Sequence, residues 1–155
     1  ALKFRRDVRH ERKNKPVYFY WDIEFVLMLR GDDKEILEAI RETLGCGRIS
    51  VNKRGMARYA VNNISDLIHK IIPFFNSYHL HAKKKFDFEL WKEAVVLLYK
   101  NKGLKTNISM TGNPRGKRKT SWDYNELKKL KEIHEKMKEY KSQRGEWRWI
   151  GQILS

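Results

Sequence analysis

Cysteine, proline and long apolar runs are scarce in this sequence. It has one cysteine, Cys46, and three prolines among 155 residues. A single thiol excludes an internal disulfide and is typical of a protein from a reducing compartment. No apolar run reaches the roughly 18 residues that a membrane-spanning helix needs, and no signal-peptide pattern opens the chain. We therefore expect a soluble, intracellular protein of the cytoplasm or an organelle matrix, with no membrane partner.

Motifs for nucleophilic catalysis and for zinc binding are missing as well. The histidines lack both carboxylate companions and the spacing of zinc ligands: His69, His79, His81 and His134. Asp22 and Glu24 share one face of a predicted strand and could bind a cation, but such acids more often pair with cross-strand partners such as Lys3 or Arg58. The sequence therefore shows neither a catalytic acid nor a metal site.

Positive charge, by contrast, is in large excess. Lysine and arginine number 34 against 19 acids, which gives a net charge of +15. Charge of this size repels itself in a folded protein, and a polyanion that neutralises it is the simplest explanation. A lysine-rich composition inherited from an AT-rich genome is the alternative. Nucleic acid is the partner that we expect.

The stretch 17–30 (VYFYWDIEFVLMLR) predicts one long strand, because apolar residues alternate along it. The apolar face consists of Val17, Phe19, Trp21, Ile23, Phe25, Leu27 and Leu29. The other face carries Tyr18, Tyr20, Asp22, Glu24 and Arg30, with Val26 and Met28 as its apolar members. We expect the first face to pack on a core and the second to meet water or a polar partner.

The remaining patterns predict an α+β chain. Residues 1–8 form a strand, a helix ends at Gly45, and a second hairpin has strands 47–52 and 56–62 around a turn at 53–55. In this hairpin Ile49, Val51, Ala57, Tyr59 and Val61 should point inward. Two helices follow, one ended by Pro73 and one after 83–85, and then comes a polar stretch. Ser121 caps a last helix with an apolar stripe: Leu127, Leu130, Ile133 and Met137.

The outward residues of the predicted strands form the candidate binding surface. They are Lys3, Arg5, Tyr18, Tyr20, Glu24, Arg48, Ser50, Asn52 and Arg58, with Lys53 and Arg54 in the turn. An antiparallel ribbon fits the major groove of DNA, where Arg can read guanine, Asn adenine, and Glu can accept from cytosine. An ordinary solvated sheet face is the alternative.

Beyond residue 100 the sequence changes character. Residues 101–120 predict a basic linker or arm that contacts phosphates without sequence preference, through Arg115, Lys117, Arg118 and Lys119. Residues 121–155 predict a C-terminal helix and a tail. That tail is apolar enough, through residues such as Trp147 and Trp149, that it should dock on this chain or on a partner.

Three segments resemble the LAGLIDADG homing endonuclease family. They are 32–50 (DDKEILEAIRETLGCGRIS), 56–75 (MARYAVNNISDLIHKIIPFF) and 83–98 (KKKFDFELWKEAVVLL), which are similar to that family's helix, second hairpin and closing helices. The resemblance covers roughly residues 1–100 and assigns them to a nucleic-acid-binding domain. It implies a four-stranded antiparallel sheet that saddles the major groove, with the helices on one face.

The resemblance also implies a catalytic arrangement. The family's first helix carries its name-giving motif and ends in the acid that holds Mg²⁺, and it would lie just ahead of Ala1. The implied protein is a homodimeric, Mg²⁺-dependent, site-specific double-stranded DNA endonuclease, in which each copy places one metal-bound carboxylate near a scissile phosphate. A lysine near the closing helix assists in that family, and Lys83, Lys84 and Lys85 are the candidates.

Two other functions stay open at this point. Without the motif helix, the same surface would belong to a catalytically inactive derivative that binds structured RNA, as an intron maturase or a ribosome-associated protein. Tyr18, Tyr20 or a terminal tryptophan would then stack on exposed bases. A basic structural protein whose sheet face packs on another chain is the third reading.

Overall fold

The computed structural model describes residues 1–7, 18–102 and 123–139. The strands are β1 (Leu2–Asp7), β2 (Tyr18–Ile23), β3 (Phe25–Arg30), β4 (Arg48–Val51) and β5 (Met56–Val61). The helices are α1 (Lys34–Leu44), α2 (Ile64–Asp66), α3 (Ile72–Ser77), α4 (Ala82–Lys100) and α5 (Tyr124–Glu139), with a 3₁₀ turn η1 (Gly31–Asp33) and a π-helical turn η2 (Leu67–Ile71). The predicted α+β class is confirmed.

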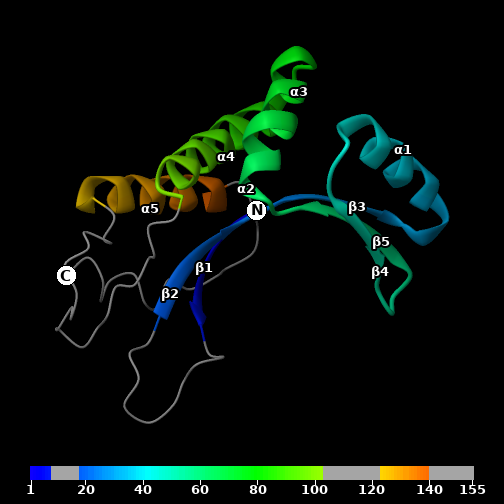
Figure 1. Cartoon of the computed structure of the whole chain (residues 1–155), viewed down its shortest axis with the longest axis horizontal. Coiled ribbons are helices and arrows are strands. Elements are labelled where there is room, and N and C mark those ends of the chain that lie inside the picture. The colour runs from blue at the N-terminus through cyan, green and yellow to red at the C-terminus, as the bar shows by residue number, and fades with distance from the viewer. Residues whose placement is uncertain (8–17, 103–122, 140–155) are drawn as a thin grey trace, which may run out of the picture.

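The single strand predicted over residues 17–30 is in fact two strands, separated at Glu24. β2 pairs antiparallel with β1, whereas β3 pairs with β5, and β5 pairs with β4. The chain therefore has a two-stranded and a three-stranded sheet, not one sheet of four strands. The two sheets follow each other along one ribbon in Figure 1. The central strand, by which we mean residues 18–30 with β2 and β3, exchanges β1 for β5 as its neighbour.

The exchange of partners at Glu24 has a visible cause. The N-terminal end of β1 lies beside Glu24, whose backbone N–H donates to the Ala1 carbonyl at 2.9 Å. The Glu24 carbonyl accepts both from the Ala1 ammonium group and, at 3.2 Å, from the indole N–H of Trp91 on α4, so a helix side chain binds where the pairing with β1 stops. On the other side, pairing with β5 begins only at Phe25, which lies opposite Val61.

The helices lie on one side of the strands (Figure 1). Buried residues of the strands and of the helices belong to one hydrophobic cluster. Ala57, Tyr59 and Val61 are 0%, 0% and 1% exposed, which confirms that β5 faces inward as predicted. Val51 was expected inward but is 52% exposed. It is the last residue of β4, next to the turn, and the hairpin tip extends away from α1 in Figure 1.

Helix α5 completes the core beside the first hairpin. Its stripe of Leu127, Leu130, Ile133 and Met137 is buried, as the spacing predicts, and belongs to the same hydrophobic cluster as Trp91 and Trp21. The His134 ring meets the Trp21 ring edge-on at 6.3 Å between centroids. Among the residues that the structure describes, no helix has both the length and the apolar character that a membrane span requires.

Candidate nucleic-acid interface

The face of the strands opposite the helices carries the predicted binding residues. Direct cross-strand pairs share a face, and the register sets Lys3 opposite Asp22 and Arg5 opposite Tyr20 in the first sheet. In the second sheet, Arg58 stands between Ser50 and Met28. Lys3, Arg5, Arg48 and Ser50 are exposed, and Tyr20 and Arg58 are half-buried.

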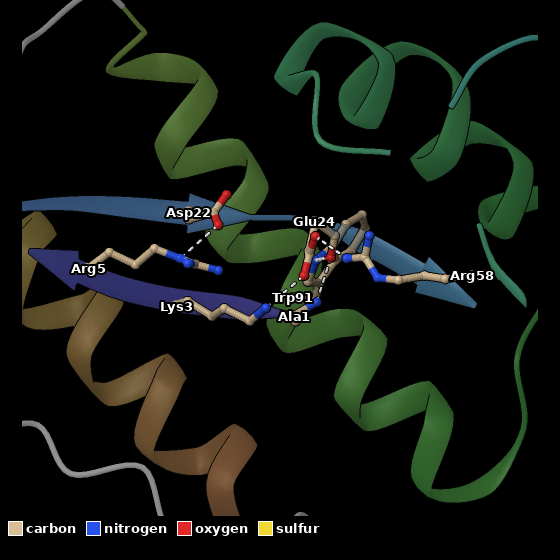
Figure 2. Close-up of polar contacts among 7 residues, drawn as sticks. All are labelled: Ala1, Lys3, Arg5, Asp22, Glu24, Arg58 and Trp91. Atoms are coloured by element: carbon tan, nitrogen blue, oxygen red, sulfur yellow. Dashed lines mark hydrogen bonds and ion pairs between the residues drawn. The ribbon is translucent and has the colours of Figure 1, made fainter. Parts of the chain in front are cut away.

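Glu24 joins the two sheets at the centre of this face (Figure 2). One carboxylate oxygen accepts from Lys3 Nζ at 2.8 Å, and the other accepts from Arg58 Nη2 at 2.6 Å. The side chain of Glu24 is 12% exposed, against 44% for Lys3 and 31% for Arg58. The carboxylate therefore lies below the surface that its two cations form, and the expected cross-strand pairing is confirmed.

The electrostatics of this cluster follow from its geometry. Burial of the Glu24 carboxyl opposes its ionisation, but the hydrogen bonds and positive charges of Lys3 and Arg58 outweigh burial and hold its pKa below the ordinary value. A second ion pair on the face joins Arg5 Nε to Asp22 at 3.0 Å, with side chains 46% and 30% exposed. Asp22 and Glu24 are thus both engaged with cations of β1 or β5.

The tip of the second hairpin is built by Asn52. Its side-chain oxygen accepts from the backbone N–H groups of Arg54 and Met56 at 2.9 and 3.0 Å, which closes the turn. Gly55 has a φ of +73°, a conformation that favours glycine. The turn presents Lys53 and Arg54, both exposed, next to the edge of the sheet. The amide of Asn52 was predicted to face a base, and its oxygen is engaged in this turn.

The three candidate lysines Lys83, Lys84 and Lys85 all lie exposed in the first turn of α4. Of the three, Lys84 lines a groove of about 740 Å³ that also touches Ala1 and Glu24. The groove is mostly apolar, and its walls come from α1, β3, α3 and α4, with residues such as Ile36, Leu27, Phe75 and Trp91. Ile36 is 53% exposed because it faces this groove.

The residues present do not fit a magnesium ion by themselves. In the described parts of the chain, no three His, Cys, Asp or Glu side chains lie close enough together to hold a metal. Glu24 and Asp22 are already paired with cations. No catalytic step is therefore routed through a metal on these residues.

Some predicted residues lie outside what the structure describes. The side chain of Tyr18 is one, and the arm residues Arg115, Lys117, Arg118 and Lys119 are the others. Conversely, sequence reasoning missed the bond from Trp91 to the Glu24 backbone and the groove beside Ala1. The sequence marks Glu24 only as one of two neighbouring acids, with Asp22, on the polar face of the predicted strand.

Comparison with known proteins gives one consistent result. The family model described as LAGLIDADG endonuclease matches residues 7–95. The chain is 33% identical over 81 residues to the probable intron-encoded endonuclease 2 of Neurospora crassa, which covers 52% of this chain and 18% of that protein. The chain spans less than a quarter of the length of each curated relative that it matches.

Solved structures show the same fold. The homing endonuclease I-TnaI superposes with a TM-score of 0.63 at 21% identity, over 99% of this chain and 87% of that one. I-SmaMI, bound to uncleaved DNA target in the presence of calcium ions, also gives 0.63 at 22% identity, over 88% of this chain and 40% of that one. At these identities the likeness concerns the fold.

Proposed function

The chain belongs to the LAGLIDADG endonuclease family, and from this premise we propose that it binds double-stranded DNA through the outer face of its strands as part of a site-specific endonuclease. The family's known enzymes of this fold include I-SmaMI, whose structure was solved on a DNA target with calcium. A divalent metal is therefore the cofactor that we propose for the complete enzyme. We place its work in the compartment that holds its own gene, cytoplasm or organelle matrix.

The observation that carries the proposal is the distribution of cations over the outer face. Lys3 and Arg5 come from β1, Arg48 from β4 and Arg58 from β5, all on the side opposite the helices. A curved antiparallel ribbon is narrow enough to enter the major groove, where arginine binds the O6 and N7 acceptors of guanine. Exposed Lys53 and Arg54 at the hairpin tip are suited to phosphates along the groove's edge.

The groove beside Ala1 supplies the second part of the proposal. The family's motif helix precedes the first strand, and this apolar groove opens next to that strand's first residue. We propose that the motif helix packs here and brings its acid to the rim formed with Lys84. The acid then comes from that helix, which agrees with the missing ligand cluster in the described residues.

Lys84 is the lysine that we propose to assist the reaction. Its place on the groove sets it apart from Lys83 and Lys85 on the same helical turn. In a chain that carries the motif helix, K84A should reduce DNA cleavage by about a hundredfold or more, the low end of what one positioned catalytic group contributes. K83A and K85A are matched controls, and a loss in either of them that equals the loss in K84A would contradict the assignment.

A cleavage assay tests the function itself. The full-length protein, incubated with Mg²⁺ and a duplex that spans the uninterrupted insertion site of its own gene, should cut that duplex and leave an unrelated one intact. The binding component is tested separately by retention of the target duplex in EDTA. Intact, unbound DNA together with tight retention of intron or ribosomal RNA would overturn the proposal in favour of the RNA-binding derivative.

A further inference from the structure

Glu24 lies where both sheets and a helix meet. Its backbone N–H is bonded to Ala1 ahead of β1, its backbone carbonyl to Trp91 of α4, and its side chain reaches Lys3 of β1 and Arg58 of β5. The backbone bonds fix the point from which the side chain projects, and its carboxylate lies between the two cations (Figure 2).

Lys3 and Arg58 stand on opposite sides of the stretch 18–30 and are also displaced along it, because Lys3 lies opposite Asp22 and Arg58 opposite Met28. Six residues of strand at about 3.3 Å each place the two backbones about 20 Å apart along this direction alone. Their charged ends nevertheless converge on one carboxylate, one on each oxygen, at 2.8 and 2.6 Å. Without an anion between them, two like charges on long side chains would separate and sample many rotamers. Glu24 therefore determines where both cations lie.

The arrangement leaves the cations available to a partner. The bond to Glu24 uses Arg58 Nη2, whereas a guanidinium carries five N–H donors and a lysine ammonium three. Both heads are more exposed than the carboxylate beneath them. A preordered arginine is what base reading requires, because each bond to a base edge depends on direction, whereas a phosphate accepts from many directions.

We propose that Glu24 is a positioning residue for DNA recognition, which holds Lys3 and Arg58 as an ordered pair of donors that reads acceptors on base edges. The inference rests on the proposed function and deepens it: Glu24 contacts no base and instead acts through its two cations. On a purely electrostatic surface, loss of this acid would raise affinity for every sequence and leave selectivity unchanged, whereas loss of a positioning residue lowers selectivity.

The test compares binding of a defined probe, a pool of duplexes with a randomised 20-base-pair interior. Selectivity is the affinity for the duplex that the wild-type chain enriches most, divided by the affinity for the unselected pool. E24Q should raise affinity for the pool by up to about fivefold, since one negative charge is gone. It should lower selectivity by about tenfold, the size of one lost bidentate contact.

D22N is the matched control. It removes the same charge from the same face, but Asp22 pairs with a single arginine at 3.0 Å. It should raise affinity for the pool as E24Q does and change selectivity by less than about twofold. E24D supplies a variant of unchanged net charge, whose shorter side chain cannot reach both cations, and it should lose selectivity without gaining affinity for the pool.

A double-mutant cycle separates positioning from a general structural role. If Glu24 acts through Arg58, E24Q should change selectivity by less than about twofold in an R58Q background. An equal loss in both backgrounds would overturn the inference, as would full selectivity in E24Q and E24D variants that keep the wild-type circular dichroism spectrum. A wild-type chain that enriches no sequence would instead overturn the proposed function itself, and the inference with it.

Discussion

Glu24 lies between buried Ile23 and partly buried Phe25, on the polar face of a stretch whose alternation continues through it. An acid at such a position is stable only when its charge is matched. Here Lys3 and Arg58 provide the match across two strand pairs. The stability of this junction is therefore linked to the ionisation of one carboxyl group.

The ionisation of Glu24 predicts a pH dependence. Its pKa is lower in the folded chain than the ordinary 4.5, so the ionised form contributes stability above pH 4.5 and loses it as pH falls through the folded value. The difference in free energy of unfolding between wild type and E24Q should be largest at neutral pH and should close below pH 4.5. Urea denaturation from pH 3.5 to 7 measures it. A difference that grows toward low pH would show that the sign is wrong.

The burial of Tyr59 predicts that its replacement lowers the free energy of unfolding and leaves DNA affinity unchanged. Its side chain is fully buried, its hydroxyl donates to the Cys46 carbonyl at 2.9 Å, and burial raises its pKa above the ordinary value. Y59F should lower the free energy of unfolding by about 1–2 kcal/mol, because that carbonyl loses its donor. DNA affinity should not change. Tyr78, which is 66% exposed, provides the control, and Y78F should leave stability within about 0.5 kcal/mol of wild type.

Among the elements, the central strand shows how far periodicity reaches. Its alternation correctly predicts that Trp21 and Ile23 are buried and that Met28 is exposed. It does not predict the division into β2 and β3, since the period of two continues through Glu24 without a break. The division depends on which strand lies alongside, and that is decided by the ends of β1 and β5.

The packing of helix α5 predicts a large loss of stability when a buried side chain of this helix is truncated. Leu130 is completely buried at the centre of its apolar stripe, in the cluster shared with α4 and β2. L130A should lower the free energy of unfolding by about 2–5 kcal/mol through loss of packing and the cavity left behind. K128A, on the exposed side of the same helix, should change it by less than about 0.5 kcal/mol. Equal effects in urea denaturation would mean that α5 does not dock as described.

At the scale of the whole molecule, positive charge and the apolar groove have separate roles. The net charge of +15 provides attraction to any polyanion, whatever its sequence. The groove beside Ala1 is lined by apolar residues of α1, β3, α3 and α4, and it also touches Glu24, at the centre of the outer face. The place that we propose for the motif helix therefore borders the face that we propose binds DNA, as cleavage of bound DNA requires.

The salt dependence of DNA binding distinguishes the arm from the sheet. Replacing Arg115, Lys117, Arg118 and Lys119 by alanine should reduce the slope of log affinity against log salt by about three to four, at ~0.9 per phosphate contact, equally for all sequences. R48A/R58A should reduce it less and change which sequence is preferred. Filter binding across salt concentrations measures both. Equal losses on every sequence in both variants would count against base reading by the sheet.

Much of the fold follows from local patterns. The alternation in β2, β3 and β5, the apolar stripe of α5 and the end of α1 at Gly45, with its φ of +64°, were all predictable. These signals depend on neighbours within about four residues, which is why a single sequence contains them. The charge excess and the family resemblance likewise indicate a nucleic-acid partner from the sequence alone.

The candidate site depended on the tertiary structure. The contacts of Glu24 join residues 21, 34 and 67 positions apart in the sequence, to Lys3, Arg58 and Trp91. No periodicity specifies which of several outward cations an acid will meet across a sheet. The sequence by itself determined which side chains are buried and which are presented. Only the packing of β1, β5 and α4 around Glu24 decided that this residue, expected to read a base, is a buried acid that binds two cations. The reason is that such contacts depend on distances between segments that are remote in the sequence.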